Sequence, residues 1–194
     1  MINNRLTYGK PVSSKPASGL PAAWLLLLLS LVFSCHCGKS PLAPYGKSFE
    51  NIMKSDTGIF RGTNFRMSSE NIKSIEPEGL KEEDNSEGIN YLFYELKVDT
   101  STSYTIAYSC PDNKLKNIET DIYLLNEPQA ADLFNAFKKY FNTRYGNSIT
   151  SGDFFIWSAT TSSGKIKIEL ADESPTYKRG KITLVVRTAN EDEQ

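Results

Sequence analysis

Two groups of closely spaced strand-like runs, separated by one helix-like segment, constrain the fold more than any other feature of this sequence. Apolar or alternating runs crowd residues 89–125 and again residues 153–189, whereas apolar residues recur at helical spacing in residues 126–146. Parallel neighbours need long crossover connections, so strands joined by short turns pair antiparallel. The sequence therefore predicts two antiparallel meanders on either side of one amphipathic helix.

Turn residues and helix caps divide these regions into individual elements. Six strands are expected, at residues 89–98, 102–110, 115–125, 153–159, 165–171 and 180–189. A short helix within residues 67–79 would start at a serine cap, Ser68 or Ser69, and a longer helix would start at Asn126. The apolar stripe of the longer helix comprises Ala130, Phe134, Phe137, Phe141 and Tyr145.

The order helix, three strands, helix, three strands suggests an internal repeat. Corresponding strands of the two groups start 63 to 65 residues apart. Two amphipathic helices can together cover one face of a sheet that is built from both groups. We therefore expect an α+β fold in which tandem αβββ units form an antiparallel six-stranded sheet with two helices packed on one face.

The uncovered face of that sheet is the candidate working surface. Residues 165–171 alternate cleanly, so that Ile166, Ile168 and Leu170 face the helices while Lys165, Lys167 and Glu169 face away. Residues 89–98 and 153–159 are apolar on both alternations, so some of their aromatic side chains should lie on the uncovered face. The expected partner-binding residues are Tyr91, Phe93, Tyr123, Phe155 and Trp157. Aromatic side chains with a charged rim are typical of protein-binding surfaces. In the alternative, loops or residues 49–66 cover this face.

The N-terminal apolar run predicts a secretory signal. It extends from Trp24 to Phe33, which is too short for a membrane span of about 20 apolar residues. Three basic residues precede the run, and residues 1–34 contain no acid, as in signal peptides. The sequence Val32-Phe33-Ser34-Cys35 then resembles a bacterial lipobox, and this resemblance implies that Cys35 is lipidated. Simple cleavage and an uncleaved short anchor are the alternatives.

These features divide the chain into four parts. Residues 1–34 are the expected signal peptide and residues 35–48, which are rich in Gly, Pro and Ser, the lipid anchor and flexible tether. Residues 49–190 form the expected single domain, and residues 191–194 a disordered tail.

The charge and cysteine content narrow the function further. The chain has 22 basic and 23 acidic residues, and removal of the three basic residues of the signal leaves a mildly acidic domain, which disfavours binding to nucleic acid.

Cys37 and Cys110 could pair in an oxidising envelope, but burial of Cys110 as a small apolar side chain is the favoured interpretation.

Catalytic and metal-binding patterns are scarce. The only histidine, His36, lies beside the expected anchor, so the domain offers no Ser-His-Asp triad. Acidic residues crowd one segment: Glu76, Glu78, Glu82, Glu83, Asp84 and Glu87. They could bind calcium, but the ligand spacing of calcium loops is absent, and a solvated acidic loop is the favoured interpretation. We expect no metal, no cofactor and no enzymatic activity.

The predicted topology resembles the β-lactamase-inhibitor-protein-like fold. The segment Arg66-Met67-Ser68-Ser69-Glu70-Asn71-Ile72 is similar to a short helix motif of small outer-membrane lipoproteins of the SmpA/OmlA type. The lipoprotein pattern, without an Asp after Cys35, implies sorting to the outer membrane. The expected function is a lipid-anchored cell-envelope module that binds another envelope protein, as an accessory to an envelope complex or as an inhibitor of an extracytoplasmic enzyme. The alternative is a carbohydrate-binding or carboxylate-dependent hydrolytic envelope protein.

Overall fold

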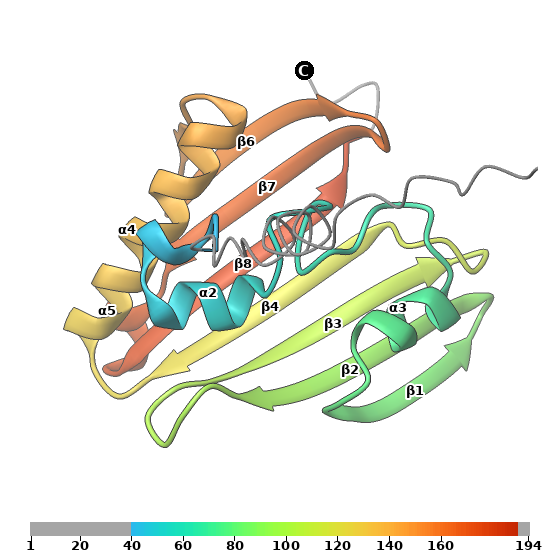
Figure 1. Cartoon of the computed structure of the whole chain (residues 1–194), viewed down its shortest axis with the longest axis horizontal. Coiled ribbons are helices and arrows are strands. Elements are labelled where there is room, and N and C mark those ends of the chain that lie inside the picture. The colour runs from blue at the N-terminus through green and yellow to red at the C-terminus, as the bar shows by residue number, and fades with distance from the viewer. Residues whose placement is uncertain (1–39, 190–194) are drawn as a thin grey trace, which may run out of the picture. The chain divides into compact units, whose positions relative to one another are not determined.

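An eight-stranded antiparallel sheet organises residues 40–189, the part of the chain that the computed structural model describes (Figure 1). The strands are β1 (Leu80–Ser86), β2 (Ile89–Lys97), β3 (Ser103–Pro111), β4 (Asn117–Leu124), β5 (Ile149–Ser151), β6 (Phe154–Thr161), β7 (Gly164–Asp172) and β8 (Gly180–Thr188). The helices are the 3-10 helix η1 (Ala43–Tyr45) and the α-helices α2 (Lys47–Met53), α3 (Ser69–Ile75), α4 (Glu127–Tyr145) and α5 (Ser174–Tyr177). The predicted α+β class and the antiparallel sheet are therefore correct.

The sheet consists of two meanders that meet in the middle. Its strand order is β1-β2-β3-β4-β8-β7-β6-β5, so the last strand of each meander, β4 and β8, pairs with the other across the centre. The predicted number of six strands is wrong, because β1 and β5 add one strand at each edge.

The missed strand β1 lies in the segment that we expected to be an acidic loop. Its backbone pairs with β2, and Glu82 lies opposite Phe93 while Asp84 lies opposite Tyr91. All seven residues of β1 are exposed. Charged side chains are common on edge strands because they oppose the pairing of a further chain. The acidic composition therefore fits an edge strand as well as it fits a loop.

Both predicted helix starts are confirmed. The Ser68 side chain accepts a hydrogen bond from the backbone N–H of Asn71 at the start of α3, and Asn126 accepts one from Gln129 at the start of α4. Of the predicted stripe on α4, Ala130, Phe137 and Phe141 are buried, and Phe134 and Tyr145 are half-buried. The stripe is wider than predicted, since Leu133 and Tyr140 are also buried.

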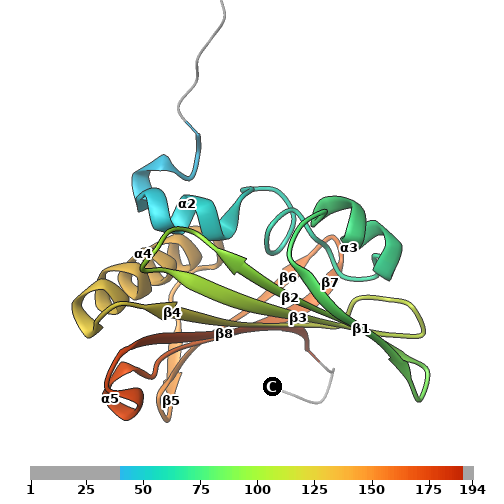
Figure 2. The same ribbon diagram turned by 90° about the horizontal axis from the view of Figure 1, so that it is seen from below.

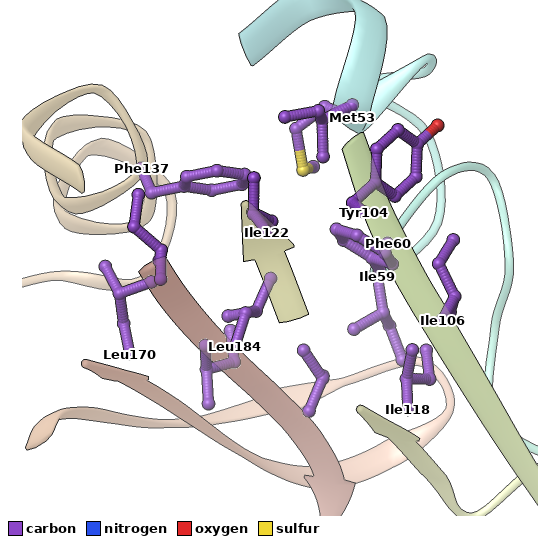
Figure 3. Packing of buried hydrophobic residues seen from close by; sticks show 14 of the residues in the cluster. Met53, Ile59, Phe60, Tyr104, Ile106, Ile118, Ile122, Phe137, Leu170 and Leu184 are labelled. Carbon is purple, nitrogen blue, oxygen red and sulfur yellow. The ribbon is translucent and has the colours of Figure 1, made fainter. Parts of the chain in front are cut away.

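Helices α2, α3 and α4 all lie on one face of the sheet, which we call the covered face (Figure 2). Figure 3 shows apolar side chains from α2, α4 and the sheet packed together there, among them Met53, Phe137, Ile122 and Leu184. The Phe49 ring of α2 lies 4.8 Å from the Phe137 ring of α4. Residues 49–66 thus pack on the covered face, and the alternative in which they shield the opposite face is wrong.

The folded part of the chain begins earlier than predicted. Leu42 is buried, and the Tyr45 ring lies 5.3 Å from the Tyr140 ring of α4, so this part of the predicted tether 35–48 belongs to the domain. The expected signal peptide, Cys35, Cys37 and the tail 191–194 lie outside the described residues. Within residues 40–189, no helix is both long enough and apolar enough to cross a membrane.

Candidate functional site

The candidate site is the sheet face opposite to α2, α3 and α4, which we call the open face. Among the described elements, only α5 lies on this side, at one end of the sheet (Figure 2). Directly opposed residues in a sheet project to the same face, so the strand register assigns the side chains. One row across the open face contains Glu82, Phe93, Ala107, Glu119, Val185 and Glu169.

Two aromatic side chains project together from β2 on the open face. Tyr91 is 42% exposed and Phe93 is 37% exposed, whereas Leu92 between them is buried on the covered face. The neighbouring strand β3 presents only small side chains beside them, with Ala107 opposite Phe93 and Ser109 opposite Tyr91. The aromatic rings therefore stand above a low strip along β3.

A hollow of about 300 Å³ lies at the centre of the open face. Its walls include Phe93, Ala107, Glu119, Asp121 and Lys181 from four strands, together with Glu173, Thr105, Thr183 and Val185. The hollow exists because the small residues of β3 lie between the aromatic residues of β2 and the longer polar residues of β4 and β8.

Lys181 is held in place by two carboxylates at the edge of this hollow. Its Nζ lies 2.6 Å from Oε2 of Glu173 and 3.5 Å from Oδ1 of Asp121. The Thr183 hydroxyl lies within hydrogen-bonding distance of both carboxylates. Burial alone would lower the pKa of Lys181, but the hydrogen bond to Glu173 and the two negative charges raise it overall. The lysine is therefore a fixed cation and not a proton donor at neutral pH.

Aromatic rings extend the site toward α5. The Arg179 guanidinium lies 4.9 Å from the centre of the Tyr123 ring, and Lys181 Nζ lies 4.2 Å from the centre of the Tyr177 ring. Tyr123 is half-buried, and this burial raises the pKa of its hydroxyl. Such cation–ring contacts fix the orientation of both aromatic side chains.

The two halves of the open face carry opposite charge. The half formed by β1 to β4 has five acids and two lysines: Glu82, Asp84, Glu95, Glu119, Asp121, Lys81 and Lys97. The half formed by β8 and β7 has four basic residues and one acid: Lys165, Lys167, Lys181, Arg187 and Glu169. One side of the central β4–β8 pair is therefore negative, and the other side is positive.

Of the five predicted partner-binding residues, Tyr91, Phe93 and Tyr123 lie on the open face, but Phe155 and Trp157 do not. Trp157 is only 1% exposed; its ring packs 5.3 Å from Phe141 and its Nε1 donates a 2.9 Å hydrogen bond to Asn142. Phe155 packs against Phe134 of α4. Trp157 is a core residue and Phe155 is half-buried against the core, because α4 lies over the face of β6 that carries them.

The acidic residues of segment 76–87 do not converge on one point. Glu76 is buried on the covered face, where Arg61 donates to it through Nη2 at 2.8 Å and Lys54 lies 3.2 Å away. Glu83 pairs with Lys73 of α3, whereas Glu82 and Asp84 project from the open face. Among residues 40–189, no group of three or more acidic, cysteine or histidine side chains is arranged to hold a metal ion.

Cys110 is fully buried and has a free thiol. Burial raises the pKa of this thiol to about 11, so it is a poor nucleophile at neutral pH. The interpretation of Cys110 as a buried apolar side chain agrees with this environment.

Sequence reasoning missed Lys181, Glu173 and the hollow. The alternation in residues 102–110 had a usable signal, because its buried tyrosines and isoleucine leave only Ser, Thr and Ala for the other face. The contact between Lys181 and Glu173 had none, because it depends on the turn that contains α5.

No protein-family model, curated protein or solved structure matches this chain. The resemblance to β-lactamase-inhibitor-like domains and small outer-membrane lipoproteins therefore rests on the predicted topology and on residues 66–72.

Proposed function

We propose that this chain is a non-enzymatic, lipid-anchored protein of the cell envelope, sorted to the outer membrane, that binds another envelope protein through its open face. The observation that carries the proposal is the exposure of Tyr91 and Phe93 beside a hollow, on a sheet face that the long helix leaves uncovered. Aromatic side chains next to a pocket and surrounded by charged groups are common centres of protein interfaces. As an accessory subunit or an inhibitor, the protein would act by binding to its partner.

The first described residues lie on the side of the sheet that faces away from the proposed binding surface. Residues 42–45 pack on α4, on the covered side of the sheet (Figure 2). The described part of the chain therefore begins on the covered side of the sheet, away from the proposed binding face. Labelling with a fatty acid tests the proposed lipid anchor: wild type should take up the label, and Cys35→Ala should not. Equal labelling of both would refute the anchor.

We also propose that the sheet is built from a repeated unit of one helix followed by a meander. α3 precedes β1 to β4, and α4 precedes β5 to β8. This arrangement supports the predicted tandem repeat, with four strands in place of three in each unit.

The carbohydrate-binding alternative has less support. Trp157, the side chain best suited to stack on a sugar, is buried under α4. The histidine-free domain and the separated carboxylates likewise give hydrolysis little support.

Capture of partners from the native envelope tests the proposed function. Phe93→Ala and Tyr91→Ala should each reduce recovery of a co-purified protein at least about tenfold, because loss of an interface hot spot costs about 2 kcal/mol or more. Leu125→Ala is the matched control, since Leu125 is an exposed apolar residue in the turn before α4. Equal recovery with all three variants would show that the open face is not the binding surface.

A further inference from the structure

We propose that the open face binds a second copy of this chain, in a symmetric pair whose two-fold axis runs parallel to β4 and β8 between the two sheets. The inference rests on the proposed binding role of this face and names an occupant for it. Three properties of the face, namely its charge, its relief and its area, support this arrangement.

The first property is the opposite charge of the two halves of the sheet. A two-fold axis along the central strands places β1 to β4 of one copy over β8 to β5 of the other. Glu119 and Asp121 on β4 then face the strand that carries Lys181 and Arg187 in the second copy. The negative half of each copy meets the positive half of its partner, and both contacts form at once because the interface is isologous.

The second property is the relief of the face. The same axis places β3 over β7, because each lies next to one of the two central strands. On this face β3 presents small side chains (Ser103, Thr105, Ala107 and Ser109), whereas β7 presents Lys165, Lys167 and Glu169. The long side chains of one copy can therefore enter the low strip of the other. The pair β2 and β6 likewise places Phe93 over the row of Ile156, which is only 8% exposed, and Tyr91 over the row of Ser158.

The third property is the area of the face. Strands about 4.8 Å apart with a rise of about 3.3 Å per residue give each strand residue about 16 Å² of the face, so the eight strands together span about 1,000 Å². Specific protein complexes bury about 800 Å² on each partner, so a single open face is large enough for a stable pair. Association through the edges of the sheet is less favourable, because β1 is charged and β5 has only three residues.

This pairing would also regulate access to the site. A different protein that binds at Phe93 must first displace the second copy, so its apparent affinity falls as the concentration of this chain rises.

Light scattering and sedimentation of the full chain in non-ionic detergent test the inference. Wild type should form pairs that dissociate as salt is raised, because salt screens the exposed charges. In one variant, Glu82→Lys and Glu119→Lys make the whole face positive; in the other, Lys165→Glu and Lys167→Glu make it negative. Each variant alone should dimerise at least about tenfold more weakly than wild type. An equimolar mixture should recover pairs that contain one copy of each.

Phe93→Ala provides a second route that does not alter charge, and it should weaken self-association with little change in the melting temperature. A wild type that stays monomeric at about 100 μM, or pairs that survive in both charge variants, would overturn the inference. If a monomeric wild type still captures a different protein through Phe93, self-association fails and the proposed function stands. If pairs form but no capture depends on Phe93, the binding of another protein fails instead.

Discussion

Trp157 and Phe93 lie in the same sheet, and both were predicted to bind a partner, yet they occupy opposite faces. Trp157 on β6 lies beneath α4 and is 1% exposed, whereas Phe93 on β2 is 37% exposed. The chemistry of the two side chains is similar, so the difference comes from the layer above each strand. In a strand that is apolar on both faces, the sequence does not show which face is core. The helix that covers one face decides whether an aromatic residue of the strand is buried or exposed.

The charged groups of the two faces differ in the same way. Glu76 on the covered face is buried with Arg61, and the Tyr104 hydroxyl completes the network at 2.8 Å from Arg61. Lys181 and Glu173 on the open face pair at the rim of a hollow. The first network holds the segment before α3 to the sheet, and the second shapes a surface.

The largest expected effect is on protein stability, and it distinguishes Trp157 from Phe93. Trp157→Ala should lower the free energy of unfolding by about 3–5 kcal/mol, because it leaves a cavity between β6 and α4. Chemical denaturation measures the change. Ser158→Ala is the control, since Ser158 is the adjacent exposed residue on the open face. If the two variants were equally stable, Trp157 would not be a core residue.

The next effect concerns the buried ion pair. Glu76→Gln should cost about 3 kcal/mol, because it leaves the charge of Arg61 buried without its counter-charge. Burial alone would raise the pKa of Glu76, but Arg61 and Lys54 lower it overall. A lowered pKa in the folded state stabilises the protein above the ordinary carboxyl value of 4.5, and this stabilisation is lost as the pH falls through the folded pKa.

The difference in stability between wild type and Glu76→Gln should therefore shrink from pH 7 toward about pH 3. Glu78→Gln, at an exposed position two residues later, should leave the pH profile unchanged. A pH-independent gap between wild type and Glu76→Gln would show that packing, and not the ionised pair, accounts for the loss.

The smallest expected effect is on the open face. Phe93→Ala should change the free energy of unfolding by less than about 1 kcal/mol, because over a third of the side chain is already in contact with solvent and β3 offers only Ala107 opposite it. Thermal melting of the full chain measures this. A loss as large as that of Trp157→Ala would place Phe93 in the core, and the contrast between the two faces would disappear.

Much of the covered face could be predicted because its signals are local. The alternation at Tyr104, Ile106 and Tyr108 places all three in the core, and Ser68 and Asn126 cap the helices that they were expected to start. These features depend on residues within one strand or one turn, where spacing in sequence fixes direction in space.

The remaining features depend on distant partners. Residues 80–86 form a strand only because β2 offers an edge, and their composition has no alternation that would predict it. The side of Phe155 and Trp157 is decided by the position of α4, and the pairing of Arg61 with Glu76 by the path of the loop between them. Tertiary packing, and not local propensity, sets each of these outcomes.

The position of β8 has a consequence for how the chain acquires its structure. β8 is the last strand of the described residues but lies at the centre of the sheet, where Arg187 lies opposite Asn117 of β4 on one side and opposite Lys167 of β7 on the other. The two meanders can therefore join only after residues 180–188 are available, and contacts between such distant residues form slowly. A nascent chain that lacks residues 180–188 presents the open edges of β4 and β7, so its sheet stays incomplete until these residues have been made.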